Sequence, residues 1–323
     1  MKNKKIDLVY LWVDGSDPKW IRRKNKFLKS VGLAEIPEAA HRYKDNDELK
    51  YSLRSVEKFA PWINHIFIIT DDQVPAWLNT KHPKITIVDH TDIIPKKYLP
   101  VFSPRPPLVS LSKIPGLSEY FLLADDDMLF GNYTTPDYFF TADDKVKVHG
   151  KSYSMKKFIK NSAPRINSGD YIKAIMNAKT LIREIHGDSH NYEWEPSHNI
   201  TGYKKSSVES AYNHPKINKA IEITYKSKIR GRDDLSQVIF QEYMLANDIA
   251  HLELVPKFGI KNIIEKFKGN ISRAYQAKKI KKRLFMPWPK LFCVNNSGMH
   301  PRIDKYNNKV LSKMFPKKSS FEV

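Results

Sequence analysis

The sequence predicts an α/β fold with a doubly wound, mostly parallel sheet and a helical C-terminal half. Two observations lead to this prediction. Strands that are buried on both faces read as continuous apolar runs, and the first part of the chain has four such runs, at 6–13, 65–70, 84–90 and 119–124. A stretch with helical periodicity separates the first two runs, and strands that alternate with helices form parallel, Rossmann-like sheets.

The expected helix covers residues 45–60, because four apolar side chains recur there at helical spacing on one face: Leu49, Leu53, Val56 and Phe59. Asp45 or Asn46 is available to cap its N-terminus. Pro61 ends it, since proline cannot continue a helix.

Three of the four predicted strands run directly into aspartates. Open α/β sheets bind ligands beyond the carboxyl ends of their strands. We therefore expect these carboxylates to surround a cleft. They are Asp14 and Asp17 after the first strand, Asp71 and Asp72 after the second, and Asp125, Asp126 and Asp127 after the fourth.

The character of the chain changes near Lys145. Residues 154–185 and 234–252 read as helical, and a block rich in lysine and arginine follows them. We expect an α/β part over 1–145, a helical part that completes the site over 146–255, and a basic C-terminal segment over 256–323.

Composition limits the function classes. The chain has 323 residues and a net charge of +20, from 55 Lys+Arg against 35 Asp+Glu. That charge predicts a polyanionic partner (nucleic acid, anionic lipid or a phosphate-bearing substrate), or else only a soluble basic surface. One cysteine excludes an intramolecular disulfide, and no run reaches the roughly 20 apolar residues of a membrane span, so a cytoplasmic protein is expected.

The sharpest local signal is LLADDDMLFG, residues 122–131. Three consecutive aspartates after a buried strand put at least two carboxylates within reach of one divalent ion, and hard oxygen ligands suit Mg²⁺ or Mn²⁺. The alternative is a solvated acidic turn. The stretch VDGSDPKW is equally open: it is either a turn in which Pro18 starts a helix, or a site where Asp14 accepts hydrogen bonds from a ribose or a base.

Two further side chains also have two interpretations. His198, in a polar loop, is either a surface residue or a general base, because imidazole can take a proton from a hydroxyl near neutral pH. Arg230, in IRGRDD, is either a surface charge or a guanidinium that binds phosphate and stabilises the charge of phosphoryl transfer. The basic C-terminal block is a solvated helical face, or a segment that lies on anionic lipid or holds a polyanionic polymer.

Taken together, these stretches resemble the Stealth family of bacterial capsule hexose-1-phosphate transferases, which is related to the animal N-acetylglucosamine-1-phosphotransferase. The first block of the family is similar to IDLVYLWVDGSDPKW. The second is similar to the stretch from DNDELKYSLRSVEKF to IPGLSEYFLLADDDMLFG, the third more loosely to His198 and IRGRDD, and the fourth to LFCVNN with MFPKKSSFEV.

The resemblance implies transfer of a sugar 1-phosphate from a nucleotide diphosphosugar, typically a UDP-sugar, to a hydroxyl of a growing glycan, with release of the nucleoside monophosphate. It implies a Mg²⁺ or Mn²⁺ ion and a place on the inner face of the cytoplasmic membrane, where capsule is assembled. Carried over by position, the metal ligands are Asp126 and Asp127, the catalytic residues are these two with His198 and Arg230, and the substrate-binding residues are Asp14, Asp17, Arg54 and Asn295.

The chain departs from the family pattern in three places. FSPRPPL, with three prolines and Arg105, replaces the usual stretch after LP-F; Asp125 stands where asparagine is usual; and Asn296 replaces an aspartate. Two rivals remain, a conventional metal-dependent glycosyltransferase and a nucleic-acid-binding protein. No nucleic-acid partner is expected, because acids cluster at the strand ends and no known nucleic-acid motif occurs. The oligomeric state is left open.

Overall fold

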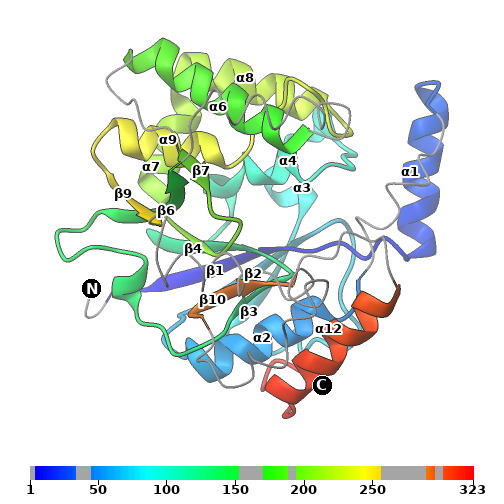
Figure 1. The fold of residues 1–323 in the computed structure, drawn as a ribbon. Helices are drawn as coiled ribbons and strands as arrows, with labels where there is room; N and C mark the ends of the chain where they lie inside the picture. Colours follow the sequence, from blue (N-terminus) through cyan, green and yellow to red (C-terminus); the bar gives the residue numbers. More distant parts are fainter. Residues whose placement is uncertain (1–3, 34–44, 153–169, 188–193, 256–288, 295–300) are drawn as a thin grey trace.

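The computed structural model describes residues 4–33, 45–152, 170–187, 194–255, 289–294 and 301–323 (Figure 1). A five-stranded sheet of order β3-β2-β1-β4-β8 forms its centre. Its strands are β1 (Ile6–Leu11), β2 (Ile66–Thr70), β3 (Ile85–Asp89), β4 (Tyr120–Asp125) and β8 (Thr201–Lys204). The first four are parallel, which confirms the predicted sheet, and β8 adds an antiparallel edge that the sequence did not predict.

The order of the strands places a topological switch point beside β1. The chain moves from β1 to β2 and β3 on one side, and then returns to place β4 on the other side. Leu11 at the end of β1 pairs with Asp125 at the end of β4. Ligands of doubly wound sheets bind at such a point, beyond the carboxyl ends of the strands.

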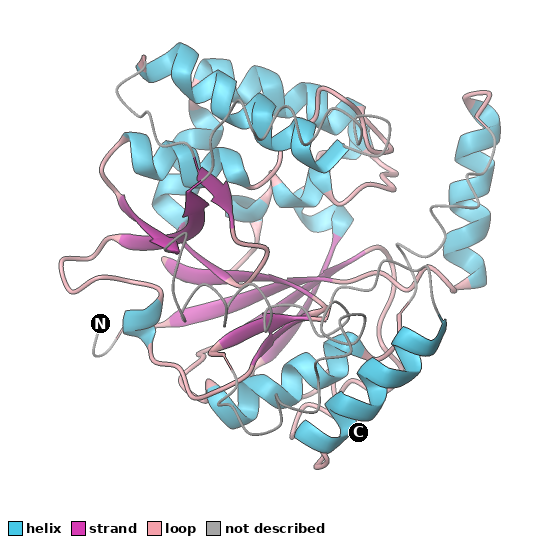
Figure 2. Cartoon of the chain, in the orientation of Figure 1, coloured by secondary structure: helices cyan, strands magenta, loops and turns pink. Residues whose placement is uncertain are grey.

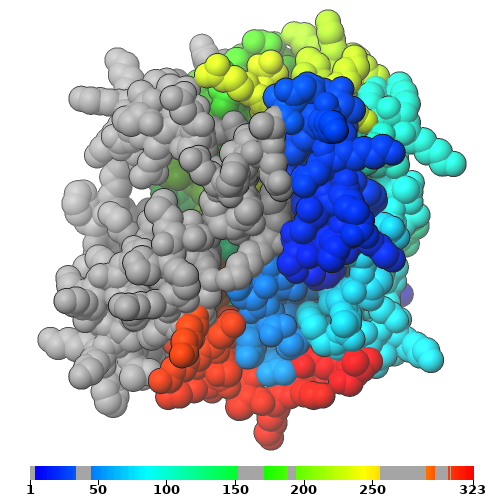
Figure 3. Space-filling view, turned by 90° about the vertical axis from the view of Figure 1, so that its right-hand side faces the viewer, coloured from blue at the N-terminus to red at the C-terminus, as the bar shows by residue number. Residues whose placement is uncertain are grey.

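Helices cover both sides of the sheet, as a doubly wound fold requires (Figures 1 and 2). On one side lie α2 (Glu48–Phe59) and α12 (Pro301–Met314). The other side carries α6 (Asp170–His186), α7 (Lys205–Asn213), α8 (Pro215–Lys226) and α9 (Val238–Ala246). α1 (Pro18–Ser30) stands apart at one edge and forms part of the face that Figure 3 shows.

Short helical turns complete the first part of the chain: α3 (His90–Ile93), α4 (Arg105–Leu108), and the 3-10 turns η2 (Lys96–Tyr98), η3 (Leu111–Lys113) and η4 (Pro136–Tyr138). Among the described helices, none combines the length and the apolar character that crossing a membrane would require.

Helix α2 carries the predicted apolar face. Leu49, Leu53 and Val56 are at most 2% exposed. The predicted cap is wrong: the helix begins at Glu48, and its N-cap Asp47 has left-handed backbone geometry. Asp45 accepts from the backbone N–H of Asp47 and Glu48 from that of Asn46, so these side chains order the residues before the helix instead.

A second sheet that the sequence did not predict lies in the C-terminal half. β6 (Val146–Ser152) stands between β7 (Trp194–Pro196) and β9 (Ala250–Val255). The predicted helix over 234–252 is therefore wrong at its end, because α9 stops at Ala246 and the left-handed Asp248 turns the chain into β9. The helix predicted over 154–185 is observed from residue 170, and its first part lies outside the described residues.

The C-terminal segment returns to the predicted acidic turn. β10 (Leu291–Cys293) pairs antiparallel with β5 (Met128–Phe130), which follows the three aspartates directly. Since β8 also joins the central sheet, the three predicted parts share their sheets.

Candidate active site

The acidic turn Asp125–Asp127 lies between β4 and β5 and is held from two sides. From α2, the buried Ser52 donates to the carbonyl of Met128 (2.5 Å), and the Ser55 hydroxyl accepts from the N–H of Phe130 (3.0 Å). From the C-terminal segment, the N–H of Val294 donates to the carbonyl of Asp127 (2.8 Å). The turn therefore has a fixed backbone at the switch point of the sheet.

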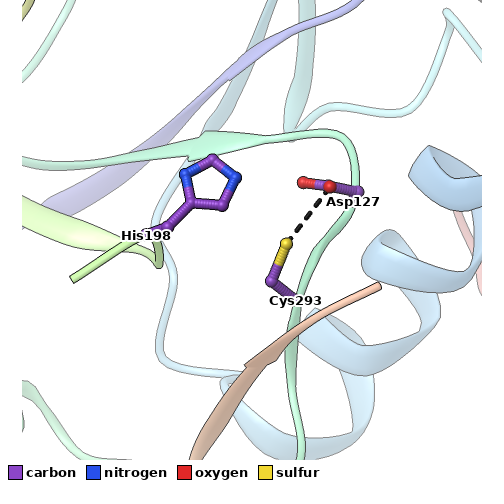
Figure 4. A group of neighbouring side chains, drawn as sticks. All are labelled: Asp127, His198 and Cys293. Atoms are coloured by element: carbon purple, nitrogen blue, oxygen red, sulfur yellow. Dashed lines mark hydrogen bonds between the residues drawn. The ribbon is translucent and has the colours of Figure 1, made fainter. Parts of the chain in front are cut away.

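Asp127, His198 and Cys293 meet at this turn (Figure 4). One possible ligand atom from each residue lies within 4.8 Å of the others. His198 comes from the loop between β7 and β8 and is exposed, whereas Cys293 is buried on β10 and donates a hydrogen bond from Sγ to Oδ2 of Asp127 (3.1 Å). Two predicted site residues, Asp127 and His198, are thus brought together, and Cys293 is an addition that residue type alone did not reveal.

The acidic turn concentrates negative charge in a poorly solvated place. Burial raises the pKa of Asp126 well above its ordinary value, and the nearby carboxylates of Asp127 and Glu48 raise it further. Burial also raises the pKa of Asp127, while His198 acts in the opposite direction. Like charges that are brought together in this way favour the binding of a cation.

The donor set fits a divalent metal ion. Oδ1 of Asp127 is buried and has no hydrogen-bond partner within the described residues. The pKa of Asp126 responds to the carboxylates around it, which are those of Asp127, Glu48, Asp125 and Asp45. Carboxylate oxygens are what Mg²⁺ and Mn²⁺ prefer, whereas the Cys293 sulfur suits softer metals and here serves as a hydrogen-bond donor to Asp127.

A polar cavity opens beside the turn. Its lining includes Asp125, Tyr171, His198, Gln237 and Gln241. The amide oxygens of Gln237 and Gln241 are buried and accept no hydrogen bond from a described residue. The cavity therefore offers polar groups to a ligand next to the carboxylates.

Arg230 lies in the loop after α8, where the N–H of the following Gly231 donates to Oδ2 of Asp234 (2.8 Å). Its positive charge acts on Arg105, a residue that the sequence indicated only as a departure from the family pattern. Arg105 in turn lies over the ring of Tyr171, 5.6 Å from the guanidinium carbon to the ring centroid. Arg230 and Arg105 are thus connected to the cavity through Tyr171.

The first block folds as the turn that was one of its two interpretations. Asp14 accepts from the N–H and the hydroxyl of Ser16, and Asp17 caps α1 by accepting from the N–H of Lys19. Gln73, which the sequence gave no reason to select, bonds the backbone of Asp14 and the carboxylate of Asp17. Substrate binding by Asp14 and Asp17 remains a prediction.

The carboxylates after β2 do not all face a cleft. Asp71 is 6% exposed and forms an ion pair with Arg23 of α1 (3.1 Å), and the same guanidinium donates to its carbonyl. The N–H of Asp72 donates to Asp89 at the end of β3. These acids fasten α1 and β3 to the sheet.

Arg54 serves the C-terminal segment. Its Nε and Nη2 donate to the two carboxylate oxygens of Glu322 (2.7 Å each), and Nη1 donates to the carbonyl of Phe315 (2.9 Å). Glu322 has only 3% of its side chain exposed. Since all three guanidinium nitrogens are engaged, the geometry gives no support to the predicted substrate contact of Arg54.

We expect Arg54→Ala to lower the free energy of unfolding by about 3 kcal/mol, because it leaves the buried Glu322 carboxylate without its partner. Urea denaturation measures this change. Glu57→Gln is the control, since Glu57 also bonds the C-terminal segment, through Ser320, but is exposed; its effect should stay below about 1 kcal/mol. An Arg54→Ala protein of unchanged stability but impaired donor binding would restore the substrate role.

Two predictions fall beyond the described residues. Asn295 lies there, directly after the Val294 that bonds Asp127, and so does most of the basic block over 256–288. Substrate binding by Asn295 and contact of the basic block with an anionic surface remain predictions.

Comparison with known proteins follows the same regions. The family description "Stealth protein CR1, conserved region 1" matches residues 4–32, and "Stealth protein CR2, conserved region 2" matches residues 42–148. A capsular polysaccharide phosphotransferase (fcs1) of Haemophilus influenzae is 31% identical over 91% of this chain and 78% of its own length. The chain belongs to the Stealth family.

Other Stealth relatives agree over most of the chain. The capsular polysaccharide phosphotransferase cps12A of Actinobacillus pleuropneumoniae is 30% identical over 95% of this chain and 81% of its own length. The receptor polysaccharide phosphotransferase WefC of Streptococcus gordonii is 30% identical over 99% of each chain. The prediction that this Stealth protein is an enzyme, a phosphotransferase, is therefore confirmed.

Proposed function

We propose that this Stealth enzyme transfers a sugar 1-phosphate from a nucleotide diphosphosugar, with a UDP-sugar as the expected donor, to a hydroxyl of a capsular or cell-surface polysaccharide. The bond that forms joins the acceptor oxygen to the sugar-bearing phosphorus. The bond that breaks joins that phosphorus to the oxygen bridging the two phosphates. The products are a phosphodiester and UMP.

The observation that carries the proposal is the meeting of His198 with Asp127 at the switch point of the sheet. His198 is exposed, so an acceptor hydroxyl from solvent can reach its ring, and the polar cavity lies beside it. In the proposed reaction His198 takes the proton of that hydroxyl as the new bond to phosphorus forms. The relatives named capsular polysaccharide phosphotransferases support the same bond type.

Asp126 and Asp127 would hold Mg²⁺ or Mn²⁺. Such an ion, when bound, neutralises charge on the diphosphate and on the leaving phosphate. Arg230 would stabilise the charge that develops on the transferred group, as a guanidinium does in other phosphoryl transfers. Asp14 and Asp17, in the tightly bonded first block, would contact the nucleotide.

The net charge of +20 supports a phosphate-rich polymer as acceptor and a place on the anionic inner face of the cytoplasmic membrane, with the basic segment over 256–288 as the contact. We propose this location together with the reaction.

Phosphorus NMR tests the reaction. Purified protein is mixed with Mg²⁺, a panel of UDP-sugars and a capsule-like oligosaccharide, and the nucleotide and the glycan are followed together. The expected result is UMP with a new phosphodiester signal in the glycan. UDP with a glycan free of phosphorus would instead establish a conventional glycosyltransferase and overturn the proposal.

A further inference from the structure

Arg105 is a buried cation without a counter-ion. Its residue is 3% exposed, and its Nε accepts no solvent contact and has no hydrogen-bond partner in the described part of the chain. No described carboxylate lies within ion-pair distance of its guanidinium, although every other strongly buried arginine or lysine discussed above has a partner. A buried, unpaired guanidinium costs stability, so its retention calls for a function.

The fold holds Arg105 beside Arg230. The N–H of Phe102, three residues before Arg105, donates to the carbonyl of Lys228 (2.6 Å), and Nζ of Lys228 donates back to the carbonyl of Leu99 (3.2 Å). Tyr98 stacks on Tyr225 at the end of α8, with 5.1 Å between the ring centroids. The segment that carries Arg105 is thus fastened to the loop that carries Arg230.

The two guanidinium groups feel each other. Burial lowers the pKa of Arg105, and the positive charge of Arg230 lowers it further, while Tyr171, Asp234 and Asp125 act in the opposite direction. The carboxylates of Asp234 and Asp125 therefore offset only part of the charge. A bound anion would remove the remaining repulsion.

The position of the pair identifies the class of anion. Arg105 lies over the ring of Tyr171, which also makes an edge-to-face contact with His198 (6.3 Å between centroids) and lines the cavity beside the acidic turn. An anion at Arg105 is therefore next to the groups proposed to act on phosphorus. Guanidinium groups bind phosphate oxygens in pairs, with a planar fork that lysine lacks.

We propose that Arg105 and Arg230 form an anion-binding subsite that takes a phosphate group of the donor diphosphate. This inference rests on the proposed function for the identity of the donor. A phosphodiester of the acceptor polymer has the same binding chemistry, so the test must separate the two sources.

Calorimetric titration with inorganic pyrophosphate, in EDTA to remove divalent ions, tests the subsite without any turnover. We expect Arg105→Met to bind pyrophosphate at least about tenfold more weakly than the unchanged protein, and Arg105→Lys to lie between them. Arg22→Gln removes an exposed positive charge from α1 and should bind normally. An Arg105→Met protein that binds pyrophosphate within about twofold of the unchanged protein would overturn the proposal.

Thermal unfolding separates this role from a structural one. Without anion, Arg105→Met should melt at the same temperature as the unchanged protein or higher, because an unpaired buried charge is removed. Pyrophosphate should raise the melting temperature of the unchanged protein but not that of the variant. A large fall in melting temperature with the pyrophosphate effect intact would show that Arg105 only supports the fold.

Dimethyl phosphate, a phosphodiester, distinguishes the sources. If Arg105→Met loses affinity for dimethyl phosphate but keeps its affinity for pyrophosphate, the subsite belongs to the acceptor and the assignment to the donor is wrong. These binding results stand whichever product the phosphorus NMR experiment finds, so failure of the subsite and failure of the proposed reaction remain distinguishable.

Discussion

Asp127→Asn is expected to lower turnover at least about a thousandfold and leave the protein folded. Asparagine keeps the shape of the side chain and an oxygen that can accept from Cys293, but it removes the charge that a divalent ion requires. The buried, unpartnered Oδ1 of Asp127 is the atom whose loss as a charged ligand matters. Steady-state kinetics of transfer measure the fall in turnover.

The same variant has a second readout that needs no activity. The folded-state pKa of Asp127 is raised, so the stability that this group contributes is complete below the unfolded value near 4 and is lost as the pH rises through the folded value. Asparagine cannot titrate. In EDTA, the decline in unfolding free energy from pH 4 to pH 8 should therefore be smaller in Asp127→Asn.

Mg²⁺ should raise the melting temperature of the unchanged protein, and this rise should be lost or much reduced in Asp127→Asn. Asp72→Asn is the matched control, because Asp72 also follows a strand but is exposed, and its left-handed backbone suits asparagine. A normal Mg²⁺ response together with substantial turnover in Asp127→Asn would remove Asp127 from the metal site.

His198→Ala is expected to lower kcat by roughly 10²–10⁴-fold, the contribution usual for a general base, with little change in the KM for the donor. The exposed ring contacts Tyr171 and lies near Asp127, so its removal leaves the buried framework unaltered. The response of the melting temperature to Mg²⁺ should persist, which separates this variant from Asp127→Asn.

His251→Asn is the control, since His251 is an exposed histidine on β9, and it should retain full activity. A rise in donor KM at constant kcat in His198→Ala would instead mean that His198 orients the donor and does not accept the proton.

The sequence predicted the parts of the fold whose signal is local. β1 to β4 were recognisable because each is a continuous apolar run, and α2 because its apolar residues recur at helical spacing. β7 and β8 were missed because they are short and interleaved with polar residues, and β9 because its apolar residues continue the pattern of α9. Element boundaries depend on tertiary contacts that a local window does not contain.

The candidate site shows the same division. Asp127 and His198 were found through residue type and family pattern, whereas Cys293 enters by pairing of β10 with β5. The bond between Arg54 and Glu322 joins residues 268 positions apart, which no local pattern can indicate. Arg105 attracted notice only as a departure, and its burial beside Arg230 gave it meaning.

The pairing of β10 with β5 also has a consequence for the timing of synthesis. Ribosomes deliver the chain from its N-terminus, and the acidic turn emerges long before its backbone partner Val294. The four parallel strands can assemble early, but the turn gains its final support only when synthesis is almost complete. A nascent chain would therefore hold its aspartates in an unfinished arrangement, and competence for catalysis would arise with the last residues translated.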